Sequence, residues 1–248
     1  MRKCDPNLRG PPTSFSAVAS DAAGMAALLR AYDSSGGSEG EEEDARFPLF
    51  AYAAARVPPE AEARVKALVE RAGKAVPGLE ALAMPDVGMQ EHARDAHVGM
   101  HVSLCHASSV GRAQIRPLVD DARRRVQRCV ARKDKGAAIT AALSLDAVAF
   151  PGGAGGRTSY LALPVITDDP SSARLVALAS ALDATACAFH LPPYHGGGFQ
   201  LHVSVAATSA PLRLLAAALA HLAPTGQRAA ATVSAVRLNV GKHVHVLL

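Results

Sequence analysis

The chain has 248 residues, which fits one or two domains, and hydrophobic residues make up 49% of it, enough for a substantial core. Its four cysteines, at positions 4, 105, 129 and 187, lack the Cys-x-x-Cys spacing of a zinc site and do not indicate a disulfide framework, which favours a reducing intracellular compartment. The polar residues 1–10 are followed by no apolar region, and no other segment is long and apolar enough for a membrane span. We therefore expect neither a secretory signal nor a membrane protein.

The formal net charge is +4, but the charges are unevenly distributed along the chain. The first 45 residues hold four basic and eight acidic side chains, which leaves 22 basic and 14 acidic ones for the rest. Residues 33–44 contain only serine, glycine and acidic residues, so we expect a disordered acidic segment over residues 1–45 and one folded domain over residues 46–248. The basic domain is compatible with a polyanionic partner, although ordinary solvated helix faces give a similar balance.

The folded part is expected to begin with a strand and a helix. Residues 47–54 are apolar and aromatic enough for the strand. A Pro-Pro pair at residues 58–59 opens a helix with one apolar face, and Gly73 marks the point where this helix ends. A short apolar segment at residues 79–82 fits either type of element, and residues 84–98 are expected to form a loop.

The middle of the chain predicts a helix followed by a hairpin. Pro117 stands near the start of the helix, whose apolar stripe repeats at intervals of three and four residues. The stripe consists of Leu118, Ala122, Val126, Cys129 and Val130. Residues 141–150 and 158–165 are the two strands of the expected hairpin, and the glycine-rich residues 151–156 form its turn.

The second half repeats this order of elements. Ser171 or Ser172 caps a helix, a loop rich in proline and glycine leads into a strand at residues 201–206, and Pro211 opens another helix. Two final strands, at residues 232–238 and 243–248, meet at a turn. This repeated order predicts an α+β fold with two pseudo-symmetric lobes, each of mostly antiparallel sheet flanked by helices.

The tripeptide His-Val-Ser occurs once in each half, with its histidines 101 residues apart. In a strand, side chains alternate between the two faces, so His101 and Ser103 share one face in the first copy. For the same reason His202 and Ser204 share one face in the second copy. Two strands that each offer an imidazole and a hydroxyl make a symmetric two-histidine site.

Two histidines suit the cleavage of a phosphodiester without a metal ion or another cofactor. Because imidazole titrates near neutral pH, one ring can accept the proton of a ribose 2′-hydroxyl while the other protonates the departing 5′-oxygen. The hydroxyls of Ser103 and Ser204 are suited to hydrogen-bond the phosphate oxygens as charge develops on them. A single His-x-Ser on a strand is more often structural than catalytic, but its repetition in two similar halves favours catalysis. The pattern leaves open which histidine is the base and which the acid.

The paired motif resembles that of the 2H phosphoesterase superfamily. Four further features are similar to the U6 small nuclear RNA phosphodiesterase family, which comprises 3′-end processing exoribonucleases. They are Tyr32-Asp33-Ser34-Ser35-Gly36 in the acidic segment, Leu143-Ser144-Leu145-Asp146 with Arg157-Thr158-Ser159-Tyr160-Leu161, Leu191-Pro192-Pro193-Tyr194, and the closing hairpin at residues 236–246. The likeness covers most of the chain from Arg46 onward.

The resemblance implies a nuclear, metal-independent 3′–5′ exonuclease of mRNA splicing that trims uridines or adenosines from the 3′ end of U6 RNA and leaves a 2′,3′-cyclic phosphate. It implies that His101 is the general base and His202 the general acid, and that the serines of both motifs hold the phosphate. Tyr194 would stack on the terminal base, and Phe150 falls close to a second base-contacting aromatic of the family. We expect RNA as the partner and a monomeric protein.

Two other functions stay open. A different 2H enzyme, either a cyclic nucleotide phosphodiesterase or an RNA ligase-like protein, would share the two motifs, although the acidic segment and the Leu-Pro-Pro-Tyr loop argue against it. A non-catalytic RNA-binding protein with the same fold is the second alternative. Replacing His101 or His202 by alanine would leave its properties unchanged but would steeply reduce the activity of an enzyme.

Overall fold

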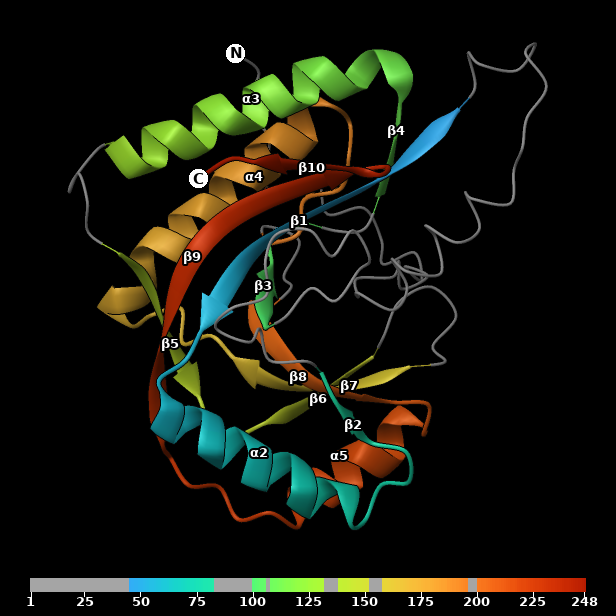
Figure 1. The fold of residues 1–248 in the computed structure, drawn as a ribbon, viewed down its shortest axis with the longest axis vertical. Helices are drawn as coiled ribbons and strands as arrows, with labels where there is room; N and C mark the ends of the chain where they lie inside the picture. Colours follow the sequence, from blue (N-terminus) through green and yellow to red (C-terminus); the bar gives the residue numbers. More distant parts are fainter. Residues whose placement is uncertain (1–44, 83–99, 106–107, 132–137, 152–157, 196–199) are drawn as a thin grey trace, which may run out of the picture.

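The computed structural model of the chain describes residues 45–82, 100–105, 108–131, 138–151, 158–195 and 200–248 (Figure 1). The predicted acidic segment apart from its last residue, the loop at residues 84–98 and most of the turn at residues 151–156 lie outside these ranges. The elements are β1 (Arg46–Arg56), α2 (Pro59–Gly73), β2 (Glu80–Ala81), β3 (His101–Ser103), β4 (Ser108–Gly111), α3 (Arg112–Ala131), β5 (Ile139–Ser144), β6 (Val148–Pro151), β7 (Ser159–Pro164), η2 (Pro170–Ser172), α4 (Ala173–Ala188), β8 (His202–Thr208), α5 (Leu212–Ala220), β9 (Arg228–Val240) and β10 (His243–Val246).

The described strands form one ten-stranded sheet, and the pairings between these strands are antiparallel. Its main path runs β10-β9-β1-β3-β8-β7-β6, while β2 pairs with β8, β4 with β1 and β5 with β9. The two lobes meet where β3 pairs with β8, with Val102 opposite Val203. The predicted α+β fold with antiparallel sheet is confirmed, and the two lobes share one continuous sheet.

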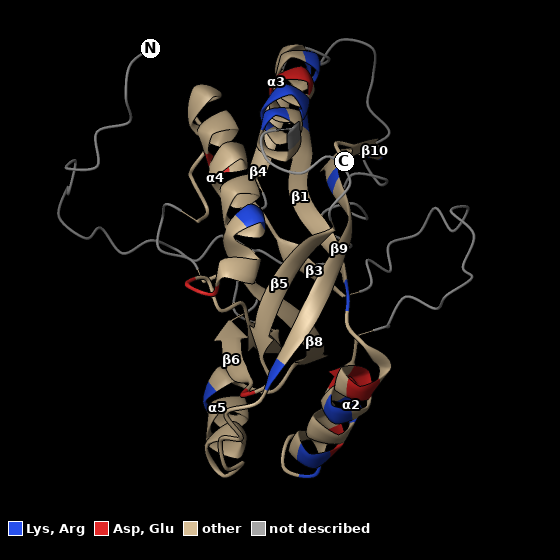
Figure 2. Cartoon of the chain, turned by 90° about the vertical axis from the view of Figure 1, so that its left-hand side faces the viewer, with Lys and Arg blue, Asp and Glu red and all other residues tan. Residues whose placement is uncertain are grey.

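Each lobe is built from both halves of the sequence. Helices α3 and α4 pack together in the lobe of β1, β9 and β10, whereas α2 and α5 lie in the lobe of β8, β7 and β6 (Figures 1 and 2). Strand β1 of the first half pairs along most of its length with β9 of the second half, and α2 contacts β8. The order of elements along the chain therefore does not reveal which elements share a lobe.

The sheet has one face that packs into the apolar core and one face that carries the histidines. Val102 and Val203 are fully buried in the core, together with alternate residues of neighbouring strands such as Leu163 and Leu238. Because side chains alternate along a strand, the histidine and serine of each motif point to the opposite face.

The sequence predicted Pro117 near the start of a helix. In the structure Pro117 lies inside α3. The helix begins at Arg112, directly after β4, a strand that the sequence pattern did not predict. Proline is a usual start signal because it lacks an N–H and disfavours the helix interior. Here the apolar stripe, with Leu118, Ala122 and Val126 buried in the core, holds the helix in place despite the proline.

The segment predicted as one strand at residues 141–150 forms two strands. Strand β6 pairs with β7 as the hairpin prediction requires, but β5 pairs with β9. Asp146 turns the chain between them, because its N–H donates to Ser144 Oγ at 3.2 Å and its carboxylate accepts the N–H of Thr225 at 2.6 Å. These side-chain bonds replace the ladder bonds that a continuous strand would make.

The predicted serine cap of α4 is also wrong. Ser172 precedes the helix, but its Oγ accepts the N–H of Ala142 in β5 at 2.9 Å and does not cap α4. Asp169 instead caps the short turn η2, because its Oδ1 accepts the N–H of Ser171 at 2.9 Å. The serine therefore ties α4 to the sheet.

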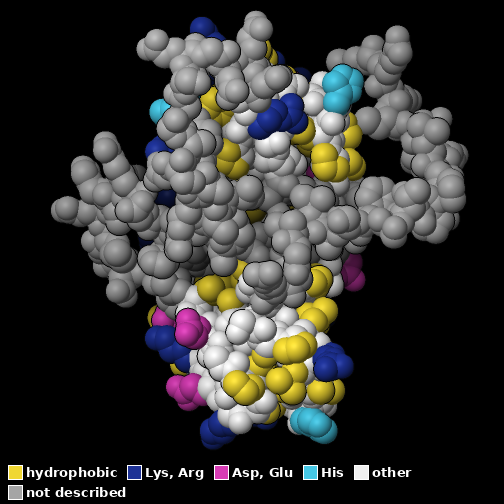
Figure 3. Space-filling view, turned by 90° about the vertical axis from the view of Figure 1, so that its right-hand side faces the viewer, with side chains coloured by type: hydrophobic (Ala, Val, Ile, Leu, Met, Phe, Trp, Pro, Cys, Tyr) yellow, Lys and Arg dark blue, Asp and Glu magenta, His cyan; other side chains and the backbone are white. Residues whose placement is uncertain are grey.

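Both lobes carry charged and hydrophobic residues on their surface. Figure 2 marks Lys and Arg residues along α3. Some of them pair with carboxylates of the same helix, as Arg125 Nε does with Asp121 Oδ2 at 2.6 Å. The exposed large hydrophobic residues include Leu212 and Leu214 on α5, and Figure 3 shows hydrophobic side chains gathered on the lower lobe. None of the helices within the described ranges combines the length and apolar character that a membrane span requires.

Candidate functional site

The two His-Val-Ser motifs lie side by side in the sheet. Strands β3 and β8 are antiparallel with Val102 opposite Val203, so Ser103 lies opposite His202, and His101 lies opposite Ser204. The two histidines are thus diagonal neighbours on one face, a relation in which the Cα atoms are about 7–8 Å apart. His101, Ser103 and His202 are buried, and Ser204 is half-buried. The structure brings the four predicted residues together as one quartet, which we define as the His/Ser quartet.

His202 is held in one orientation by two contacts. Its Nδ1 lies 2.9 Å from the carbonyl oxygen of Gln200, and since a carbonyl only accepts, Nδ1 carries the proton and donates it. The ring of Phe150 stacks on the imidazole, with centroids 4.0 Å apart and an angle of 14° between the planes. These contacts leave Nε2 as the ring nitrogen for a substrate.

The buried position of His202 favours its neutral form. Desolvation by burial lowers the pKa of His202 below its ordinary value of 6.5, and the hydrogen bond to the carbonyl of Gln200 opposes this effect only in part. With Nδ1 protonated, the neutral ring offers a lone pair at Nε2, so the free protein presents His202 mainly as a proton acceptor.

His101 has a different aromatic environment, made by two residues of β1. The ring of Phe50 meets the imidazole edge-on at 5.7 Å and 86°, and the ring of Tyr52 does so at 5.5 Å and 70°. Tyr52 lies opposite Ser103 in the β1–β3 pairing. These aromatics were not among the predicted site residues, although their spacing of two residues in a strand places both on one face.

No protein family model and no curated protein sequence matches the chain. Solved structures are similar to it. Usb1 of Kluyveromyces marxianus matches with a TM-score of 0.56 and 16% identity, over 81% of this chain and 97% of that one. The same protein with uridine monophosphate gives a TM-score of 0.55 and 15% identity over the same shares. E. coli LigT complexed with 3′-AMP gives a TM-score of 0.43 and 18% identity, over 82% of this chain and 94% of that one.

The similarity to Usb1 extends over both lobes, because it covers four fifths of this chain and nearly all of the other. The chain has the 2H phosphoesterase fold. This fold is the one expected from the repeated motif, and within it the His/Ser quartet lies at the junction of the two lobes.

Tyr194 does not have the exposed position in this 2H fold that base stacking requires. Its side chain is fully buried, at 0% exposed, and its N–H donates to the buried carboxylate of Asp183 at 2.6 Å. Stacking on a nucleobase needs a free ring face. The prediction that Tyr194 stacks on the terminal base is therefore wrong for the conformation described here.

Phe150, the second predicted aromatic, lies next to the quartet. It is half-buried, and one face of its ring is covered by the imidazole of His202. Its position beside a quartet histidine agrees with a place in the site, whereas contact with a base remains a prediction. The family resemblance thus identified an aromatic that touches the quartet.

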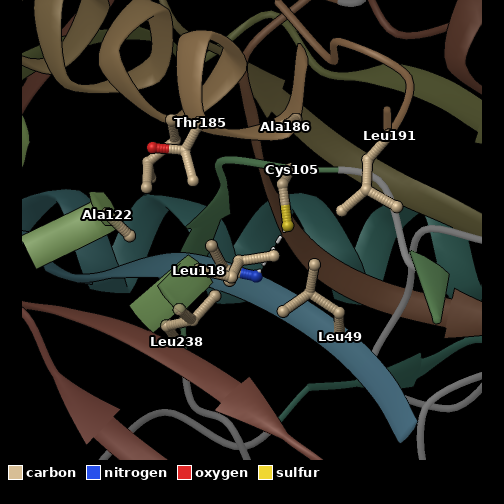
Figure 4. A pocket seen from close by; sticks show the side chains of 10 residues that line it. Leu49, Cys105, Leu118, Ala122, Thr185, Ala186, Leu191 and Leu238 are labelled. Carbon is tan, nitrogen blue, oxygen red and sulfur yellow. Dashed lines mark hydrogen bonds between the residues drawn. The ribbon is translucent and has the colours of Figure 1, made fainter. Parts of the chain in front are cut away.

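A small cavity in this 2H fold lies in the core and not at the quartet (Figure 4). It has a volume of about 20 Å³ and is lined mainly by apolar side chains from β1, α3 and α4, such as Leu49, Leu118 and Ala186. Cys105 borders it, and its Sγ accepts the N–H of Ala51 at 2.9 Å. Burial raises the pKa of the Cys105 thiol to about 12, so it is an inert core thiol at neutral pH.

The His/Ser quartet contains no carboxylate. Among the described residues, no group of three or more His, Cys, Asp or Glu side chains is arranged to hold a metal ion. Two imidazoles and two hydroxyls on one face provide a proton acceptor, a proton donor and two hydrogen-bond donors. These groups match the needs of phosphodiester cleavage by acid–base catalysis.

Proposed function

We propose that the chain is a metal-independent 3′–5′ RNA exonuclease that trims the 3′ oligouridine end of U6 small nuclear RNA and leaves a 2′,3′-cyclic phosphate. The observation that carries this proposal is the His/Ser quartet, in which two histidines lie diagonally across β3 and β8. The similarity of the fold to Usb1, solved also with uridine monophosphate, supports a uridine-containing RNA as the substrate. Action as a monomer in the nucleus, in mRNA splicing, belongs to the same proposal.

The proposed reaction has one transfer step at the last phosphodiester of the RNA. His101 removes the proton of the 2′-hydroxyl of the penultimate nucleotide, and this oxygen attacks the adjacent phosphorus. The bond from phosphorus to the 5′-oxygen breaks, and His202 protonates that oxygen as the terminal nucleoside leaves. The shortened RNA keeps the phosphate as a 2′,3′-cyclic ester. Ser103 and Ser204 hydrogen-bond the non-bridging oxygens as negative charge increases on them.

To act as the acid, His202 must become protonated when the substrate binds. Burial lowers its pKa in the free protein, so His202 is mainly neutral before RNA binds. A phosphodiester anion beside the imidazole stabilises the imidazolium and raises its pKa. Binding of the negatively charged substrate therefore supplies the condition under which His202 carries the proton that it donates.

The test is stepwise shortening of a 3′-oligouridylated RNA in the presence of a chelator. We expect the wild-type protein to release the terminal nucleoside first and nucleoside 2′,3′-cyclic phosphates in the later steps, and to leave a cyclic phosphate on the RNA. His101→Ala and His202→Ala should each reduce the rate by about 10²–10⁴-fold. His221→Ala, which removes an exposed histidine at the end of α5, serves as the matched control.

Each alternative function gives a distinct result in the same experiment. Opening of a small cyclic nucleotide without shortening of the RNA would identify another type of 2H enzyme. RNA binding without any cleavage, unchanged in the two histidine variants, would identify a non-catalytic RNA-binding protein. Either result overturns the proposed exonuclease.

A further inference from the structure

A continuous row of side chains crosses the sheet through the His/Ser quartet. Ser103 lies opposite His202 on one side and opposite Tyr52 on the other. Tyr52 in turn lies opposite Arg237 of β9, and Arg237 lies opposite Val246 of β10. Directly opposite residues of an antiparallel pair point to the same face, so Arg237 is on the face that carries the quartet.

The burial of β9 agrees with this orientation of Arg237. Its neighbours Val236 and Leu238 are buried in the apolar core, whereas Arg237 is half-buried on the other face. The Nε of Arg237 is buried, and no hydrogen-bond partner for it is found among the described residues. Two strand spacings separate β9 from β3, so Arg237 lies about 10 Å from the strand of His101.

The proposed chemistry gives the bound RNA a direction across the sheet. The base acts on the penultimate nucleotide and the acid acts on the departing terminal nucleoside, so the upstream RNA lies on the side of His101 and the terminal nucleoside on the side of His202. From His101 the sheet continues through β1 to β9 and β10. The upstream chain therefore runs toward Arg237.

The two ends of the row differ in whether their side chains can bind a phosphate. Beyond His202 the row ends at Pro164 of β7, which has no charge and no N–H donor. Beyond Tyr52 it reaches Arg237 and then Val246, whose side chain is 56% exposed. The neighbouring row through His101 continues in Ala54 and Ala235, which offer no side-chain donor. A cation followed by an exposed rim gives the upstream RNA both a phosphate ligand and an exit.

We infer that Arg237 binds a phosphate upstream of the scissile one, so that the site takes a polyribonucleotide of at least three nucleotides in preference to a dinucleotide or a cyclic nucleotide. This inference rests on the proposed function, because it uses the direction in which the exonuclease would hold its substrate. A guanidinium suits the role, since its planar set of N–H donors binds two phosphate oxygens at once. Arg237 is a binding residue and takes no part in proton transfer.

The first test compares a uridine dinucleotide, which has no upstream phosphate, with a uridine pentanucleotide. The quantity measured is the ratio of kcat/KM for the pentanucleotide to kcat/KM for the dinucleotide. Arg237→Ala should lower this ratio about tenfold, and Arg237→Lys should lower it less, because lysine keeps the charge but not the paired donors. Arg116→Ala, which removes an exposed arginine of α3, is the control and should keep the wild-type ratio.

The second test measures binding and does not depend on cleavage. In a protein with His101→Ala and His202→Ala, the affinity for the labelled pentanucleotide is followed as salt is increased. Adding Arg237→Ala should reduce the slope of log K against log salt by about 0.7, the value for one phosphate contact on a single strand. A neutral methylphosphonate at the upstream linkage bound by Arg237 should weaken binding only when Arg237 is present.

The outcomes separate the inference from the function on which it rests. If wild-type protein shortens RNA but Arg237→Ala keeps both the ratio and the salt slope of the control, the inference is overturned and the exonuclease stands. If neither substrate is cleaved, the proposed exonuclease fails. The salt slope and the methylphosphonate scan then still decide whether Arg237 binds RNA phosphate. Circular dichroism of Arg237→Ala checks that the variant is folded.

Discussion

The two copies of His-Val-Ser are identical in sequence but lie in different surroundings. His101 is met edge-on by Phe50 and Tyr52 of the neighbouring strand β1. His202 is stacked face to face with Phe150 and is hydrogen-bonded through Nδ1 to a backbone carbonyl. A sequence symmetry therefore does not give a chemical symmetry, because strand neighbours determine how each imidazole is oriented and solvated. The proposed roles of base and acid assign different chemistry to these two rings.

The largest expected effect tests whether the two histidines have these different roles. His101→Ala and His202→Ala should each lower kcat by about 10²–10⁴-fold on ordinary RNA. An RNA whose terminal nucleoside leaves through sulfur at the 5′ position needs no acid, because a thiolate is a good leaving group without protonation. On this substrate the activity of His202→Ala should return to near that of the wild type, whereas His101→Ala should stay slow.

Single-turnover rates on the oxygen and sulfur substrates measure this rescue. Rescue of His101→Ala in place of His202→Ala would exchange the two roles. Equal rescue of both variants, or of neither, would contradict the division into base and acid. His221→Ala should follow the wild type on both substrates.

Substitutions of Phe50 and Phe150, the aromatic neighbours of the two histidines, should affect stability and activity to different extents. Phe50 is fully buried, so Phe50→Ala should reduce the free energy of unfolding by about 3 kcal/mol or more. Phe150 is half-buried and stacks on His202, so Phe150→Ala should lower kcat about tenfold with a smaller loss of stability.

Urea unfolding and kcat, measured on the same preparations, test this pair of variants. Phe50→Leu and Phe150→Leu serve as controls that keep apolar volume without the ring. A loss of kcat in Phe150→Ala that Phe150→Leu does not share would mean that apolar volume, and not ring stacking, orients His202.

The sequence predicted the quartet because strand alternation and a repeated motif are local properties. His101 and Ser103 share a face, as do His202 and Ser204, whatever the rest of the chain does. The pairing of β3 with β8 needs contacts between residues 101 positions apart, and the repeated motif predicted a shared site but not this pairing. The aromatic contacts of His101 were missed because they depend on the register of β1 against β3.

The errors have the same origin in long-range packing. The proline signal for the start of α3 was overridden by burial of the apolar stripe, and the single strand at residues 141–150 was interrupted by the bonds of Asp146 to Thr225. The resemblance implied that Tyr194 stacks on a base, yet the structure buries its side chain completely. Local composition does not report which side of a loop faces the core.

The smallest expected effect concerns the pH dependence and follows from the stacking of Phe150 on His202. An acid must be protonated, so kcat/KM should fall as the pH rises through the pKa of His202, which burial places below 6.5 in the free protein. Phe150→Ala admits water to the imidazole and should move this alkaline limb to higher pH, toward the ordinary value. Phe50→Leu, which alters the surroundings of His101, should leave the limb in place. An alkaline limb that does not move in Phe150→Ala, measured from pH 5 to 8 at constant ionic strength, would show that a group other than His202 is the acid.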